Sequence, residues 1–451
     1  MKKKAVLSLA LCLALVFALA LPGFAANYDQ PAQELKDIGL FQGTNNGFEL
    51  DRAATRTEAG VMLVRLLGME QQAKEQFAAG EISHPFQDVP AWADAYVAWM
   101  YKNGLTKGVD ATHFGTGDCN AQMYSTFVLR ALGYSEADGD FTYAEALKMA
   151  ERLGLYQSEF LSDAFLRDEV AAMSYQALAT RVKGTETTLL QKLVDDGVVK
   201  QEAARELLDK QAIYAEYCAA AKLPEGRIAM AMRSTVKMAA RIPALGMTTE
   251  STADADMAVI LDENGMQMSA VVKSTTGEQT ATVREWLKDG WLYVDGGEDG
   301  KYKAELNLAG LDDLSDLGMV DLSAAEAGPL YLFDKIVKNA DGSYTISYNP
   351  ALNDIVNEMV SAQIGDDQSV KINFKLNDTT VYFKDGQMQK ILSKMEVAVA
   401  TEVGGQTVDM DMDMDITVDI TAWGDAVTIT YPADLDTYPE LTDDMLTDTA
   451  A

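Results

Sequence analysis

Hydrophobic positions in the first part of the chain follow a pattern that occurs three times. Residues 35–43 match residues 100–108, the same offset places residues 64–68 on residues 129–133, and a third copy runs over residues 141–182. Each copy predicts a helix, a turn with glycine, a short extended piece and a second helix. The glycine after each first helix suits a left-handed helix end. The pattern therefore predicts an all-α bundle of three units, at about residues 28–70, 84–134 and 141–183.

The second half of the chain changes to a two-residue alternation of apolar and polar positions. A helix is predicted from Ile228 to about Arg241, and helical stretches also at about 311–336 and 352–363. Between them, turns with glycine separate short alternating segments, which predicts an antiparallel, strongly curved sheet with helices on one side. The predicted strands are 257–261, 266–273, 280–287, 291–294, 344–348, 370–376, 380–383, 388–403, 408–421 and 427–431.

The fold class that follows is an α+β multidomain protein. Residues 184–222 carry an apolar stripe interrupted by Gly197, which predicts a helical connector that either packs on the bundle or forms a two-helix hairpin. Residues 223–440 are expected to form the sheet domain, and residues 441–451 an acidic tail.

The second unit carries the most specific sequence signature. It opens at residues 86–97 with Phe-Gln-Asp-Val-Pro-Ala-Trp-Ala-Asp-Ala-Tyr-Val and continues at 103–108 with Asn-Gly-Leu-Thr-Lys-Gly. This opening is similar to that of an S-layer homology repeat. Thr-Arg-Thr-Glu at 55–58 and Leu-Arg-Asp-Glu at 166–169 resemble the Thr-Arg-Ala-Glu signature of that family. The first unit lacks the Phe-x-Asp-Val opening, and the second replaces the signature by Asn-Ala-Gln-Met at 120–123.

The resemblance implies non-covalent binding to a secondary cell-wall polysaccharide, which in this family often carries a ketal-linked pyruvate. Thr55 and Glu58 have the spacing of a capping box, a feature common to many helices. Arg56 stands beside the same helix start, where an anion is favoured and an arginine forks onto a carboxylate. The candidate polysaccharide-binding residues are Thr55, Arg56, Glu58, Trp92, Gln122, Arg167 and Glu169.

The candidates of the second and third units differ from those of the first. Trp92 either stacks on a sugar or fills the core, and we favour the core because Tyr96 and Trp99 share its helix. Leu166 lacks the hydroxyl with which Thr55 caps its helix, so the third site differs from the first. In the second unit Ala121 stands where Arg56 stands in the first, so that groove is expected to bind poorly, or through Gln122 alone.

The alternation over residues 409–420 places Asp409, Asp411, Asp413, Asp415 and Asp419 on one face of a strand and methionine, isoleucine and valine on the other. We favour a solvated acidic face over a calcium ladder. The layout of this half, with its closing segment at 427–433, resembles the half-barrel lipoprotein-carrier superfamily. That resemblance implies an apolar ligand held between sheet and helices.

The leading residues predict the compartment. Lys2, Lys3 and Lys4 precede an apolar run over 5–21, and Gly-Phe-Ala at 23–25 forms a cleavage site, so residues 1–25 are expected to be a signal peptide. A membrane anchor is the alternative. With a net charge of -32, the chain is a poor partner for nucleic acid or anionic lipid. The protein is expected to be secreted and held at the cell wall.

Catalytic motifs are missing from the sequence. It has only two histidines, no zinc-binding cysteine spacing, no phosphate-binding loop and no nucleophile elbow, so neither an enzyme nor a cofactor or metal site is predicted. The leading hypothesis is a wall-anchored surface protein that displays a binding or structural domain. The alternatives are a carrier of a lipid or other apolar ligand and, less favoured, a wall-acting hydrolase.

Overall fold

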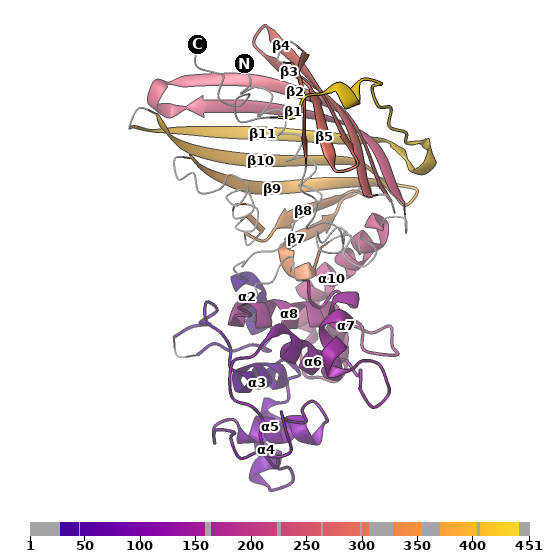
Figure 1. Ribbon diagram of the computed structural model, residues 1–451. Helices are drawn as coiled ribbons and strands as arrows, with labels where there is room; N and C mark the ends of the chain where they lie inside the picture. The colour runs from indigo at the N-terminus through magenta and orange to yellow at the C-terminus, as the bar shows by residue number, and fades with distance from the viewer. Residues whose placement is uncertain are drawn as a thin grey trace.

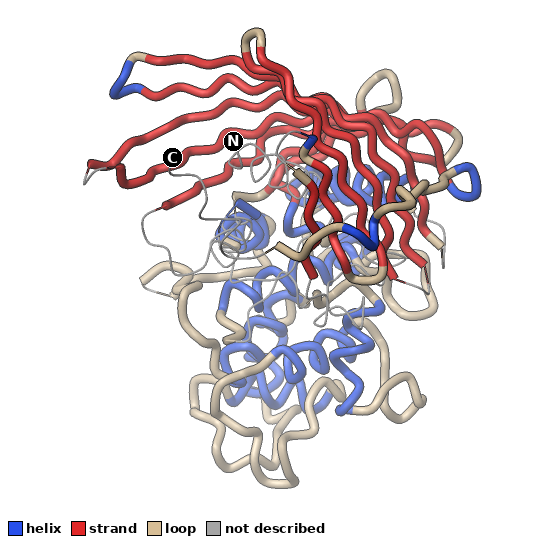
Figure 2. The backbone as a smooth tube through the Cα atoms, turned by 45° about the horizontal axis from the view of Figure 1, so that its top comes forward, coloured by secondary structure: helices blue, strands red, loops and turns tan. Residues whose placement is uncertain are grey.

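The computed structural model describes residues 28–44, 46–157, 164–222, 227–262, 265–297, 300–305, 328–350, 352–353, 357, 370–403 and 406–441. Helices make up its first part and a large curved sheet its second, which confirms the α+β class. In Figure 1 the helices lie together at one end of the molecule and the sheet at the other, with α10 between them. Figure 2 shows the sheet arching over the helical part. The expected signal peptide and nearly all of the acidic tail lie outside the described residues.

Helix pairs form the first part, which we call the helical unit. Three longer helices, α3, α6 and α8, contact one another, and each receives a shorter helix: α5 packs on α3, α7 on α6, and α2 on α8. Each shorter helix thus packs on the second helix of the preceding pair, and the first pair closes the ring onto the last. The bounds are α2 Asp29–Asp37, α3 Arg56–Leu66, α4 Glu70–Ala78, α5 Asp94–Lys102, α6 Ala121–Ala131, α7 Ala146–Arg152 and α8 Arg167–Ala179.

The extended pieces before the longer helices meet one another. Ala53 pairs with Leu166, and Thr55 pairs with Asp118, so the segment before α3 lies between those before α6 and α8. The expected left-handed glycines at the ends of the shorter helices are also present, at Gly39, Gly104 and Gly154. The helix starts of the three pairs are therefore brought close together.

The connector consists of α9 (Leu189–Asp195) and α10 (Gln201–Ala221), with Gly197 in the left-handed conformation between them. It packs on both neighbours, since α9 contacts α8 while α10 contacts β7 and β10. Lys210 fixes α10 to the bundle: its ammonium donates to Glu34 Oε1 at 3.3 Å and to the Tyr175 hydroxyl at 2.9 Å. Further along α10, the ring of Tyr217 packs edge-on against Phe333 and other sheet aromatics. A single hydrophobic core therefore runs from the helical unit into the edge of the sheet.

The sheet has eleven described strands in the order β6-β5-β4-β3-β2-β1-β11-β10-β9-β8-β7, and every neighbouring pair is antiparallel. Strands β1 to β6 pair in chain order, as do β7 to β11, and β1 pairs with β11 to join the two halves, so β6 and β7 lie at opposite edges of the sheet. The bounds are β1 Ile228–Ile242, β2 Met247–Asp262, β3 Gly265–Thr276, β4 Gln279–Lys288, β5 Trp291–Asp295, β6 Lys301–Glu305, β7 Phe333–Lys338, β8 Tyr344–Tyr348, β9 Val370–Lys384, β10 Gln387–Val403 and β11 Gln406–Trp423.

The prediction of a helix from Ile228 to Arg241 is wrong, because this segment is strand β1 in the middle of the sheet. Its alanines, methionines, lysine and arginines favour helix locally. The same residues also alternate, with Met232 and Val236 buried and Arg233 and Lys237 exposed. Pairing with β2 on one side and β11 on the other outweighs the weak local preference.

Three other expectations are corrected. Residues 333–338 form strand β7, where the end of a helix was expected. Residues 311–327 and most of 352–363, which were also expected to be helical, lie outside the described residues. Residues 427–431 form no strand, and Val427 packs against Ala229 and Ile260 instead. The expected strands 370–376 and 380–383 are the single strand β9.

Strand β11 has the two faces that its alternation predicts. Asp411, Asp413 and Asp415 are exposed, while Met414 is buried. The aspartates pair with cations on neighbouring strands, for example Asp413 with Arg241 at 2.7 Å. The methionine face belongs to an apolar surface that includes Met232, Met257, Met268, Met395 and Met414. In the described part of the chain, no helix is both long and apolar enough to cross a membrane.

Candidate functional site

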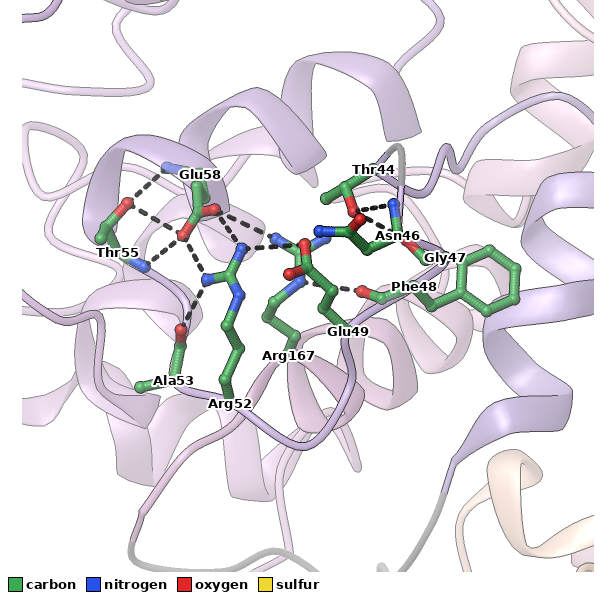
Figure 3. A network of polar contacts seen from close by, with 10 residues as sticks. All are labelled: Thr44, Asn46, Gly47, Phe48, Glu49, Arg52, Ala53, Thr55, Glu58 and Arg167. Carbon is green, nitrogen blue, oxygen red and sulfur yellow. Dashed lines mark hydrogen bonds and ion pairs between the residues drawn. The ribbon is translucent and has the colours of Figure 1, made fainter.

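The start of α3 carries a polar network, shown in Figure 3. Thr55 accepts a hydrogen bond from the Glu58 amide at 3.2 Å, and Glu58 accepts one from the Thr55 amide at 2.9 Å, so the predicted capping box is present. Arg52 forks onto the same carboxylate, with distances of 2.6 Å to Oε1 and 3.0 Å to Oε2. The signature glutamate is therefore already held by its own helix and by Arg52.

Arg167, the first residue of α8, reaches into this network from the third helix pair. Its side chain is 4% exposed, its Nε donates to the Phe48 carbonyl at 3.1 Å, and its Nη1 lies 3.6 Å from Glu58 Oε1. Its amide donates to the Arg52 carbonyl at 2.9 Å. Three of the predicted site residues, Thr55, Glu58 and Arg167, therefore meet in this network. A fourth, Arg56, is the first residue of α3 and follows Thr55 directly.

Electrostatics keep this network charged. Burial alone raises the pKa of Glu58, but hydrogen bonds from Arg52 and the Thr55 amide and the charge of Arg167 outweigh it and lower the value to about 2. Glu49 lies 3.5 Å from Arg52 and has its pKa lowered by a hydrogen bond from Thr44 and by Arg52. The network therefore contains two arginines and two ionised glutamates.

Arg56 points to a different place from Arg167 and has different neighbours. Its guanidinium lies over the rings of Phe114 at 5.1 Å and Phe127 at 4.8 Å. The residue is 7% exposed, and its Nε is buried with no hydrogen-bond acceptor among the described residues. Burial lowers its pKa, partly offset by the nearby groups Cys119 and Tyr143. No described carboxylate forms an ion pair with it, so a buried positive charge is left for an anion to meet.

The loop beside Arg56 is held rigidly by one aspartate. Asp88 accepts hydrogen bonds from the amides of Phe114 at 2.7 Å and Gly115 at 2.8 Å, so both of its oxygens are occupied. Gly115 is left-handed and lies against the Arg56 side chain, while Val109 next to it is 57% exposed. We call Arg56, Phe114, Phe127, Gly115 and Val109 the Arg56 cluster.

Gln122 and Trp92 stand at the edges of this region. Gln122 donates to the Tyr143 carbonyl at 2.5 Å and so holds this segment in place. The ring of Tyr143 is 48% exposed and lies near Arg56. The prediction that Trp92 fills the core is wrong, because it is 58% exposed, while Tyr96 and Trp99 are buried. The reason is that α5 begins only at Asp94, so Trp92 precedes the helix and does not share its buried face.

The remaining predicted residues are placed as follows. Ala121 begins α6, capped by the Asn120 side chain, and presents no charge. Glu169 is 1% exposed and accepts a hydrogen bond from the Leu166 amide. Beside it Asp168 is also buried, and burial together with the Glu169 charge raises its pKa to about 7. No group of three or more acidic, histidine or cysteine side chains in the described part of the chain is arranged to hold a metal ion.

Sequence reasoning missed two parts of the site. Arg52 lies outside every signature, although its place six residues before Glu58 on a turn rich in polar groups is a weak signal. Phe114 and Phe127 come from another helix pair, and no local pattern connects them with Arg56.

Comparison with known proteins adds little. No family model and no curated protein matches this chain. Among solved structures, a candidate AttH from Nitrosomonas europaea is similar, with 11% identity over 42% of this chain and 51% of that one, at a TM-score of 0.17. The S-type phycobiliprotein lyase of Guillardia theta has 8% identity over 46% of this chain and 93% of that one, at 0.16.

A candidate outer membrane lipoprotein-sorting protein domain from Vibrio parahaemolyticus has 10% identity over 49% of this chain and 94% of that one, at 0.17. This chain spans only about half of the AttH chain. Since all three TM-scores are far below 0.5, we draw no argument from them.

Proposed function

We propose that this chain is a secreted cell-surface protein whose residues 28–183 are three S-layer homology repeats that bind a secondary cell-wall polysaccharide. The observation that carries the proposal is the Arg56 guanidinium, buried between Phe114 and Phe127 with an unpaired Nε. Support for three repeats comes from the ring of helix pairs and from the meeting of their helix starts.

A carboxylate on the glycan, such as a ketal-linked pyruvate, has the chemistry that this site lacks. An arginine donates two parallel hydrogen bonds to a carboxylate, and the contact is strong where water is excluded. The start of α3 adds a favourable field for an anion. The exposed Val109 and Tyr143 offer apolar surface for the face of the sugar, and Trp92 offers a further ring on the loop before α5.

The test is co-sedimentation of the mature full-length chain with isolated wall sacculi. Arg56→Gln should weaken binding about 10- to 100-fold, which corresponds to about 1.5–3 kcal/mol for a charged hydrogen-bonded contact. Removing the ketal from the wall by mild acid should weaken wild-type binding by a similar factor and leave the variant unaffected. The matched control is Arg181→Gln, because Arg181 is 67% exposed and pairs only with Glu186 at the surface.

Wild-type binding that ignores both the ketal and Arg56 would contradict the proposed site, and absence of sacculus binding would contradict the proposed function. Edman sequencing of secreted protein should begin at Ala26. A sequence that begins at Met1 would remove the basis for the surface location.

A second function is favoured by the apolar face of the sheet. Methionines from five strands line it: Met232, Met257, Met268, Met395 and Met414. Methionine makes adaptable apolar surfaces, which suits a lipid or another apolar ligand. Solvent extraction of the purified mature chain followed by mass spectrometry should then release a stoichiometric apolar compound. Extracts free of such a compound, together with no uptake of a fluorescent fatty acid, would leave the sheet as a displayed structural domain. On either outcome we propose a binding protein and no catalysis.

A further inference from the structure

The Arg56 cluster has a counterpart between the third and first helix pairs, which we call the Arg167 site. Arg167 begins α8 as Arg56 begins α3. Each arginine meets the loop of the next pair at a phenylalanine: Arg56 lies over the ring of Phe114, and Arg167 donates to the carbonyl of Phe48. The two places therefore correspond in the arginine at the helix start and in the phenylalanine of the next pair, although the contacts between them differ.

The residue after each phenylalanine is where the two places differ. Gly115 and Glu49 both have positive φ, at 87° and 50°. Glycine adopts this conformation freely, whereas L side chains adopt it rarely. A Cβ on Gly115 would lie 2.7 Å from Val109 Cγ1, so Val109 would have to move, and 3.6 Å from Arg56 Cδ, in van der Waals contact with the arginine. At the corresponding position in the first pair the chain carries a carboxylate.

At the Arg167 site, the positive charges of the two arginines are balanced by carboxylates of the chain itself. Glu58 accepts from Arg52 at 2.6 Å and lies 3.6 Å from Arg167, while Glu49 lies 3.5 Å from Arg52. Two arginines thus face two carboxylates (Figure 3). Arg56, in contrast, has no ion pair among the described residues, and Asp88, whose charge acts on it, accepts hydrogen bonds from two backbone amides.

We infer that Glu49 blocks the Arg167 site by supplying from within the chain the carboxylate that a ligand brings to the Arg56 cluster, so that the helical unit binds one acidic group per chain. Glu49 is then the residue that determines how many of the two sites bind a ligand. This inference rests on the proposed function, because it concerns the same ligand.

The experiment is isothermal titration calorimetry of the mature full-length chain with a synthetic monosaccharide glycoside that carries a ketal-linked pyruvate. Wild-type protein should bind one equivalent. Glu49→Gly should fold, since it places glycine at a left-handed position, and should bind two equivalents because Arg52 and Arg167 then exceed Glu58 by one charge. Adding Arg167→Gln to Glu49→Gly should return the stoichiometry to one.

Asp51→Gly is the matched control, because it removes an exposed acid from the same loop and introduces the same residue. It should leave one equivalent. Two equivalents on wild-type protein, or one on folded Glu49→Gly, would overturn the inference and leave the proposed function intact. Should Glu49→Gly melt far below wild type, Glu49→Gln replaces it, with the same two outcomes. No heat from wild-type protein, with no effect of Arg56→Gln on sacculus binding, would instead remove the proposed function.

Discussion

The helical unit and strand β11 of the sheet place their charged side chains differently. In the sheet, alternation sends Asp411, Asp413 and Asp415 to the outer face, where cations on neighbouring strands meet them in water. In the helical unit, Arg56 and Arg167 are buried at helix starts. Surface pairs contribute little to stability, whereas a buried charge must be matched or it is costly. The buried charges of the helical unit are therefore the places where function is to be sought.

The largest expected effect on stability comes from placing a charge on the buried face of the sheet. Met414 is buried between Met238 of β1 and Met395 of β10. Met414→Asp should place an unpaired charge there and cost about 4 kcal/mol or more. Asp411→Asn on the exposed face should change stability by less than about 0.5 kcal/mol. Urea unfolding followed by circular dichroism measures both, and equal effects would contradict the assignment of the two faces.

A smaller effect is expected at Arg167. Its removal leaves the Phe48 carbonyl without its donor and Glu58 with one cation fewer. Arg167→Gln should therefore lower the free energy of unfolding by about 3 kcal/mol. Thermal unfolding of the mature chain is the measurement. A loss below about 1 kcal/mol would mean that the contacts of Arg167 with Phe48 and Glu58 contribute little to stability.

The buried acid pair predicts a pH effect. The pKa of Asp168 is raised to about 7 in the folded protein, while in the unfolded chain it is about 4. Between these values the folded protein holds a proton that the unfolded chain has lost, so Asp168 makes stability fall as the pH rises from about 4 to 7. Asp168→Asn should stabilise by on the order of 2 kcal/mol at pH 8 and by little at pH 4. A stability difference that does not depend on pH would contradict the buried, protonated acid.

The smallest stability effect is expected at Arg56. Its cation–π contacts stabilise the fold by about 1–2 kcal/mol, but its charge is buried and unpaired, so the two contributions oppose each other. Arg56→Gln should change the free energy of unfolding by less than about 1 kcal/mol while it weakens binding about 10- to 100-fold. Chemical denaturation run beside Arg167→Gln tests this contrast. A large loss in Arg56→Gln would assign the residue to the core.

Local sequence patterns correctly predicted those features that depend only on local interactions. The Thr55–Glu58 capping box needs only one helix turn, and the two faces of β11 need only alternation, so both were predicted. Strand β1 was missed because its alanines and methionines favour helix and only pairing with β2 and β11 decides the outcome. Local patterns predict an element only where long-range pairing agrees with them.

The same limit applies to the candidate site. The signature predicted both Arg56 and Arg167 as polysaccharide-binding residues, but it did not predict which of them has an ion-pair partner. Their difference depends on Phe127, which lies under Arg56, and on Glu58 and Glu49, whose charges act on Arg167. These residues come from other segments and meet the arginines only in the folded chain. Trp92 was assigned to a helix that begins two residues later, and a boundary error of that size decides whether a side chain is buried or exposed.

The most direct test of the central claim observes the two arginines separately. Nε–H resonances of arginine in the mature chain are recorded by NMR and assigned with Arg56→Gln and Arg167→Gln, and the pyruvate-ketal glycoside is then titrated in. The Arg56 resonance should shift and saturate, because its Nε has no acceptor until a carboxylate arrives. The Arg167 resonance should stay in place, because its Nε already donates to Phe48. A shift of Arg167 with none at Arg56 would contradict the account.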